Sequence, residues 1–267
     1  MSTTDRAFAS QVFASLDKVG AKPPAAVTES WQQTQLLSEK VRALGIRPES
    51  VYAAIADALQ RGDDPTLDAE VQRILVASQI SNDGVTSGVD EIAYSRFRAV
   101  VTEHADGIIA AFCKSFDAAA KTLADAHQAF GDVDLTDTDA VLRKGGDAAA
   151  RWAQATAAVA TIDTINQGWT MLAMFAGLAG NNPRYHVLRI AAPTFEQWQT
   201  LELAGRKLTA WEALLAGLTL SLPTYTQYRA RVATITDGAQ QEAAQIEDDQ
   251  VRLRTGRRPL DRAAAIG

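Results

Sequence analysis

The amino-acid sequence predicts an all-α protein: a bundle of several long helices with a smaller N-terminal group of short helices. Apolar residues recur at intervals of three and four along most of the chain, which is the period of an amphipathic helix. Proline is poorly tolerated inside helices, and none lies between Pro65 and Pro183, so long helices can form there without interruption. An apolar fraction of 47% over 267 residues is enough to bury a sizeable core.

The first quarter of the chain holds several prolines, which predicts short helices separated by turns. The segment Ala21–Ala25 contains two of them and is expected to be a linker. Asp64 can cap a helix and Pro65 fits its first position, so a further helix is expected there, with Leu67 on its apolar face. The expected elements are a helix over 4–19 in an N-terminal helix or arm (1–20), then a short-helix region (27–82) with helices over 27–44, over 48–61 and from Asp64 onwards.

The centre of the chain is predicted to form two long helices. Apolar residues keep the helical spacing throughout Asp90–Phe130, and Gly131 then ends this very long helix. Asp147 can cap the second helix, which the segment Gly180–Pro183 closes. Its broad apolar stripe over 147–179 suits a partner helix, supplied either by the same chain or by another.

Two further helices are expected in the last third of the chain, after a short extended piece over Tyr185–Ile190. Thr194 and Gln197 form a capping-box pattern, which predicts the start of a helix that runs to Pro223. A more polar helix is expected to follow over 224–253.

The sequence carries no recognisable catalytic, cofactor-binding or metal-binding motif. Its three histidines, His104, His127 and His186, are too far apart to form a His-x-x-x-His or Glu-x-x-His pair. The run Asp132–Asp139 lacks the glycine and the final glutamate of a calcium loop, so it is expected to form a turn and cap a helix. Cys113 lies in an apolar segment and is expected in the core. No enzyme activity, cofactor or metal is therefore predicted.

The five tryptophans fall on the apolar faces of the expected helices, where large aromatic side chains fill a core. A place in the core is therefore the first expectation for all five tryptophans. Trp198 and Trp211 are also candidates for anchoring a subunit interface, because aromatic residues are enriched at the centres of such interfaces.

The net charge of −6 means that the surface as a whole repels phosphate backbones, so contact with nucleic acid would need a local basic patch. The N-terminus lacks the apolar run of a signal peptide, and the most apolar stretch is shorter than the roughly 20 residues needed to cross a bilayer. The sequence therefore predicts a protein of the cytoplasm or of a virion, without a membrane partner.

The sign of the charge reverses near the C-terminus, beyond the expected long-helix bundle of 88–250. Acidic residues up to Asp249 are followed by a basic tail, 251–267, that contains five arginines and one aspartate. Such a tail can bind an acidic protein surface or nucleic acid, or it can stay solvated. The candidate partner-binding residues are Arg252, Arg254, Arg257, Arg258 and Arg262.

The long helices and the Arg252–Arg262 segment together resemble helical virion and assembly proteins of tailed bacteriophages, including scaffolding proteins whose basic helical C-termini dock on the coat protein. The resemblance and the lack of site motifs imply a non-enzymatic structural or assembly protein. Its expected partners are copies of itself, as a homo-oligomer, or a coat-type protein. Two other classes stay open: a helical bundle with a ligand pocket or active site at a core polar residue such as Asn166 or His127, and a nucleic-acid-associated factor that uses the C-terminal arginines.

Overall fold

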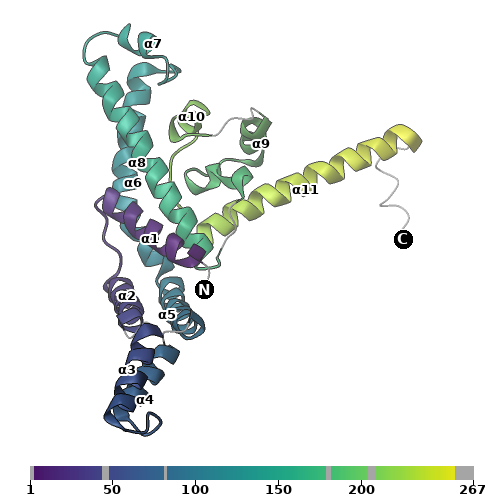
Figure 1. Ribbon diagram of the computed structural model, residues 1–267. Coiled ribbons are helices and arrows are strands. Elements are labelled where there is room, and N and C mark those ends of the chain that lie inside the picture. Colours follow the sequence, from purple (N-terminus) through teal and green to yellow (C-terminus); the bar gives the residue numbers. More distant parts are fainter. Residues whose placement is uncertain (1–2, 44–47, 81–82, 179–181, 204–207, 256–267) are drawn as a thin grey trace. The chain divides into compact units, whose positions relative to one another are not determined.

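The computed structural model confirms the all-α prediction (Figure 1). Within the part of the chain that it describes, the secondary structure consists of eleven α-helices and two short 3-10 helices, without a strand. The described residues are 3–43, 48–80, 83–178, 182–203 and 208–255.

The chain divides into two compact units, and the boundary between them falls inside two of the long helices. This division differs from the expected one, in which the short helices and the long-helix bundle were separate regions. Only part of the expected bundle, 88–112 and 167–181, lies in the same unit as the short helices. The 2.6 Å hydrogen bond from Ser38 Oγ to Asp90 Oδ1 is one contact between the two regions within that unit. Unit 1 comprises 1–112 and 167–181, and unit 2 comprises 113–166 and 182–267.

Unit 1 contains the N-terminal helices, and the first three begin and end within two residues of their predicted bounds. Their sequences alternate apolar and polar residues with the helical period, and prolines or glycines separate them. The helices are α1 (Thr3–Lys18), α2 (Ala25–Ala43), α3 (Pro48–Arg61), α4 (Ala69–Ile80) and α5 (Asp83–Glu103), with the start of α6 (Ala105–Phe130) and the end of α8 (Ala148–Phe175).

The helix expected from Asp64 begins later, at Ala69, which corrects the prediction. The Asp64 carboxylate accepts hydrogen bonds from the backbone nitrogen (2.9 Å) and the hydroxyl (2.7 Å) of Thr66, and so stabilises a turn. Asp68 caps the helix instead, because its carboxylate accepts from the backbone N–H groups two and three residues further on, at 2.9 and 3.0 Å. Leu67 consequently lies in the turn, 78% exposed, and not on an apolar helix face.

The prediction of a single long helix over Asp90–Phe130 is also wrong in detail, because His104 separates α5 from α6. The backbone nitrogen of Ile108 still donates to the His104 carbonyl at 3.0 Å, so the interruption is local. Gly107 lies in the first turn of α6, and a Cβ atom there would lie 3.0 Å from the side chain of Pro24. The apolar spacing continues across the break and therefore does not reveal it.

Glycines in the left-handed conformation follow both long helices. Gly131, with φ of 66°, ends α6 as predicted. Helix α8 ends at Phe175, earlier than the predicted Gly180–Pro183, because Gly177 adopts φ of 68° and the next backbone N–H donates to the Ala173 carbonyl at 2.9 Å. This is the Schellman arrangement, which satisfies a carbonyl at the helix end.

Aromatic rings form the centre of unit 1. Trp31 lies against Phe97, with ring centroids 5.2 Å apart, and Phe13 stacks on Trp31 at 5.3 Å. Phe97 also contacts Phe175, at 5.5 Å, and Tyr94 meets Trp31 edge to face at 6.2 Å. Helices α1, α2, α5 and α8 each contribute to this cluster.

Unit 2 contains the remaining parts of α6 and α8 and the shorter helices that follow them. Leu123 and Phe130 of α6, together with Ile162 and Ile165 of α8, are almost completely buried. The other elements are α7 (Thr138–Leu142), the 3-10 helices η1 (Pro183–Tyr185) and η2 (Val187–Arg189), α9 (Phe195–Leu203), α10 (Ala210–Leu215) and α11 (Tyr225–Thr255).

Two predictions for unit 2 are corrected and three are confirmed. The segment Tyr185–Ile190 was expected to be extended, but it contains η2 and the end of η1. The helix expected from Thr194 to Pro223 is split into α9 and α10, because a second capping box, Thr209 with Glu212, starts a new helix. The first capping box and the final helix are confirmed. The aspartate-rich run forms a turn and caps α7 through Asp137, as expected.

The absence of a side chain at Gly168 is predicted to be essential for packing in unit 1. A Cβ atom there would lie 2.8 Å from both Phe112 Cζ and Ser15 Cβ, whose side chains are buried. We expect Gly168→Ala to lower the free energy of unfolding by about 1–3 kcal/mol, because overpacking outweighs the higher helix propensity of alanine. Urea denaturation checks this. Gly88→Ala in α5 is the matched control, since nothing lies within 4 Å of its added Cβ, and it should be neutral or stabilising by up to about 1 kcal/mol.

Candidate protein-interaction surfaces

The two tryptophans considered as interface anchors lie inside unit 2. Trp198 is 7% exposed and Trp211 is 3% exposed. Their indole nitrogens donate to the backbone carbonyls of Arg184 and Val133, each at 3.1 Å. Both side chains therefore serve the core, and the structure favours the core interpretation over a subunit contact.

Arg231 on α11 holds the segment around η2 in place. One guanidinium nitrogen, Nη1, donates to the carbonyls of Leu188 and Ala191, each at 2.9 Å, and to that of Ser221 at 3.2 Å. The other, Nη2, donates to the Ser221 hydroxyl at 2.7 Å. Burial lowers the pKa of Arg231, but a guanidinium stays protonated in proteins, so the charge is kept where several backbone carbonyls converge. These contacts give Arg231 a structural role.

The core polar residues considered for a ligand pocket also have internal contacts. Asn166 is 4% exposed, and its amide nitrogen lies 2.5 Å from His186 Nε2. His127 meets the ring of Trp211 edge to face, with centroids 5.7 Å apart. Burial raises the pKa of Tyr228, and a hydrogen bond from Arg189 opposes that rise. Asn166 thus has an internal polar contact, whereas the buried Nε2 atom of His127 has no hydrogen-bond partner within the described part of the structure.

Cys113 also fits the core interpretation, although it is partly accessible. Burial raises the pKa of its thiol, and the nearby carboxylate of Asp117 adds to the rise. The thiol is therefore protonated near neutral pH, which makes it a poor nucleophile.

A polar groove of about 260 Å³ lies between α6 and α8 in unit 2. Its charged groups include Asp147 and Arg151, whose Oδ2 and Nε atoms are 2.7 Å apart in an ion pair along α8. Neither histidine nor cysteine lines it. Among the described residues, no group of three or more histidine, cysteine, aspartate or glutamate side chains is arranged to hold a metal ion.

Large apolar side chains are exposed on the hairpin of α3 and α4, a feature that the sequence analysis missed. Tyr52 is 70% exposed, Leu59 is 61% exposed and Leu75 is 39% exposed. We call these three residues the apolar flank. The two helices pack on each other and are joined by a short loop, so they run antiparallel (Figure 1).

The three side chains of the apolar flank lie on the same side of the hairpin. Ala58 is fully buried and marks the face of α3 that packs on α4. At about 100° of rotation per residue, Tyr52 and Leu59 both lie to one side of that face. Leu75 lies to the corresponding side of the contact face of α4, and antiparallel packing brings it to the same side of the hairpin. Val76, 57% exposed, points away from α3 instead.

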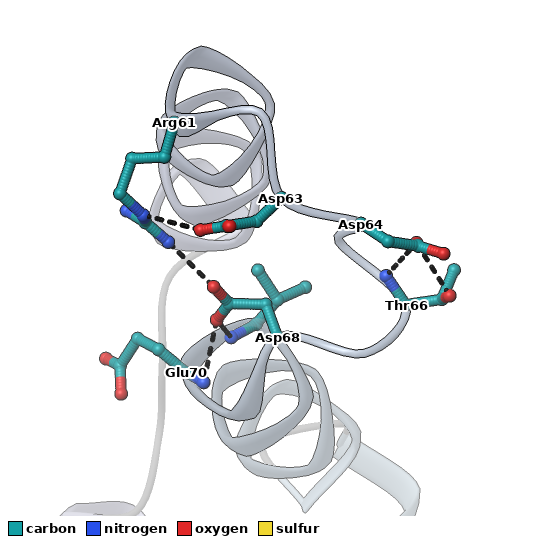
Figure 2. A network of polar contacts seen from close by, with 7 residues as sticks. Arg61, Asp63, Asp64, Thr66, Asp68 and Glu70 are labelled. Carbon is teal, nitrogen blue, oxygen red and sulfur yellow. Dashed lines mark hydrogen bonds and ion pairs between the residues drawn. The ribbon is translucent and has the colours of Figure 1, made fainter.

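A network of charged and polar contacts orders the loop between the two helices (Figure 2). The Arg61 guanidinium reaches Asp63 at 3.0 Å and Asp68 at 2.7 Å. Hydrogen bonds from backbone N–H groups, followed by the contact with Arg61, hold the pKa of Asp68 below its usual value, and the Thr66 hydroxyl does the same for Asp64. The network thus fixes the ends of α3 and α4, and with them the flank.

The last part of α11 is the second exposed surface. Tyr228 and Ile235 in its first half are buried, and Glu242 accepts hydrogen bonds from Gln199 at 3.0 Å. Every residue over 243–251 is exposed, including Ile246 at 51%. In Figure 1 the yellow end of this helix lies away from α9 and α10.

Of the candidate partner-binding arginines, Arg252 and Arg254 lie on α11, which extends to Thr255. The side chains of these two residues lie outside the described part of the structure, as do Arg257, Arg258 and Arg262 altogether. The expected basic tail of 251–267 is thus helical at its beginning.

Comparisons with models of protein families, with curated proteins and with solved structures found no match. Within the described residues, none of the helices combines the length and the apolar character that a bilayer span requires. The chain's own surfaces are therefore the basis for inferring its function.

Arg231 is predicted to be irreplaceable by lysine. A lysine ammonium lacks the planar fork that reaches the three carbonyls and the hydroxyl, so buried acceptors would lose their donors. We expect Arg231→Lys to lower the free energy of unfolding by about 2 kcal/mol in urea denaturation. Arg229→Lys, at an exposed position on the same helix, should change it by less than about 0.5 kcal/mol. Equal effects of the two substitutions would contradict the structural role of Arg231.

Proposed function

We propose that this protein is a non-enzymatic structural or assembly protein that acts through protein–protein contacts. The observation that carries the proposal is the apolar flank of the α3–α4 hairpin, where Tyr52, Leu59 and Leu75 are exposed on one side. Isolated exposed apolar residues are common, but three large ones on one side of a small hairpin are typical of a contact surface.

Few side chains are buried where α3 and α4 pack on each other. Among the described side chains of α3 and α4, those of Ala58, Val71 and Ile74 are buried. The flank offers larger side chains than these, and full burial of each would contribute roughly 1.5–3 kcal/mol. Short helices in water depend on such packing for most of their stability. A protein partner that covers the flank would therefore stabilise the hairpin as well as bind to it.

The partners that fit this surface best are other protein chains, beginning with a second copy. The long helices and the Arg252–Arg262 segment favour a virion or scaffold-type component of a tailed bacteriophage, with a coat-type protein as the other partner. Nucleic acid is a weaker candidate, because the net charge of the chain is −6 and the run of basic residues without many acids is confined to 251–267.

Self-association through the flank is tested by measuring mass with light scattering over a range of protein concentrations. We expect the unmodified protein to form a defined oligomer. Tyr52→Glu with Leu59→Glu should raise the dissociation constant at least about tenfold, because two apolar contacts are lost and charges would be buried.

Val76→Glu is the matched control, since it replaces an exposed apolar side chain of the same hairpin on the other side of α4. It should leave the mass unchanged, and circular dichroism should show equal helix content in all three proteins. A monomer at every concentration would overturn self-assembly as the function. Equal dissociation by the control variant would show that the flank is not the contact.

A further inference from the structure

The charges of the α3–α4 hairpin are sorted to one side of it. Every charged side chain that the structure describes within the two helices lies, at about 100° of rotation per residue, on the side opposite the apolar flank. These residues are Asp57 and Arg61 on α3, and Glu70 and Arg73 on α4. Two acids and two arginines give this side no net charge, so it has no attraction for anionic lipid or nucleic acid. The flank side offers apolar side chains and amides instead.

Helix α3 carries two apolar stripes. The first, with Val51 and Ala58, faces α4, and Ala58 is fully buried there. The second consists of Tyr52, Ile55 and Leu59, which are three and four positions apart on the flank side. This is the spacing of the seam along which one helix packs on another. Because Tyr52 and Leu59 stay largely exposed beside α4, the second stripe can take another helix over about 10 Å, at 1.5 Å per residue.

We propose that the apolar flank pairs with the flank of a second copy, with the two α3 helices antiparallel and a twofold axis between Ile55 and Ala56. The proposal rests on the proposed function and specifies the geometry of its contact. Positions 52 and 59 are equally distant from this axis, so Tyr52 packs on the partner's Leu59, and this contact occurs twice. Near the axis, Ile55 lies beside Ile55 of the partner subunit. The stripe is thus complementary to itself, which identifies a second copy as the occupant.

The other twofold arrangement, in which α3 packs on the partner's α4, is less favourable. The flank side of α4 carries Gln72 and Gln79 as well as Leu75, and both glutamines are exposed. In that arrangement they would lie opposite the apolar stripe of α3, and their amides would lose water without gaining hydrogen bonds. With the α3 helices at the centre instead, the glutamines lie at the margin of the contact, where polar groups keep their water.

Cysteine cross-linking in the full-length protein tests this geometry. Cys113→Ala first removes the only cysteine of the chain. Tyr52→Cys and Leu59→Cys are then made separately in this background. Under mild oxidation, an equimolar mixture of the two should form at least about fivefold more covalent dimer than either variant alone, because a disulfide needs Cα atoms within about 7 Å. In either variant alone, the two thiols are offset by seven residues along antiparallel helices, or about 10 Å.

Ile55→Cys in the same background keeps both large exposed side chains of α3. Its thiol lies next to the axis, so this variant should link to itself. Val76→Cys is the matched control, since it places a thiol on the side of α4 that points away from α3. It should give only background levels of covalent dimer, alone or mixed with the Tyr52→Cys protein. Each oxidation is made at a concentration where light scattering shows that the reduced Ile55→Cys protein is associated.

Two results would overturn the antiparallel pairing. If the Tyr52→Cys and Leu59→Cys proteins each link to themselves and not to each other, the helices pair in parallel. If no variant links above the level of the Val76→Cys control, although the unmodified protein is an oligomer, the flanks do not meet across a twofold axis.

The outcome is distinguishable from that of the self-assembly test. If Tyr52→Glu with Leu59→Glu dissociates the oligomer, but the cysteines do not link as expected, the antiparallel geometry is wrong and the proposed function stands. If the unmodified protein is a monomer at every concentration, both proposals fail, and the flank is left to a chain of different sequence.

Discussion

The amphipathic helices of this chain are stable in water only where another surface covers their apolar stripe. This constraint accounts for the folded core and is the basis of the proposed contacts. In the core the cover comes from the same chain. Phe116 of α6 and Ile162 of α8, for example, are completely buried. The same requirement applies to the α3–α4 hairpin, where Tyr52 and Leu59 are largely exposed. Burial of these side chains by a second chain, as proposed above, would lower the free energy in the same way.

The sequence predicted the helices well because their apolar spacing is a local property. It predicted their ends less well, since these depend on which of several capping residues is used. Asp64 and Asp68 can both cap α4, and the sequence does not show that Asp64 bonds Thr66 instead. The break at His104 was missed for another reason, because the apolar period runs through it.

The candidate surfaces were predicted only in part. The charge reversal on α11 was visible in the sequence, since it depends on residue types along one helix. The apolar flank was not, because exposure depends on which other helices lie nearby. The sequence did contain one signal of the flank. Tyr52 and Leu59 make the apolar side of α3 wider than Ala58 and Ile55 require for packing on a single neighbouring helix. The roles of Trp198 and Trp211 were likewise decided by tertiary contacts, namely hydrogen bonds to distant backbone carbonyls.

The two surfaces differ in chemistry, and this difference matters for assembly. The flank exposes large apolar side chains, whose burial is a nondirectional contribution, whereas the exposed residues 243–251 of α11 are mostly polar or charged. A twofold contact closes on itself and gives a pair. When one chain makes two such contacts with two different copies, however, each pair has a free surface at both ends and the series continues. A chain with two such contacts would therefore build an extended or closed array, which is what the proposed assembly function requires.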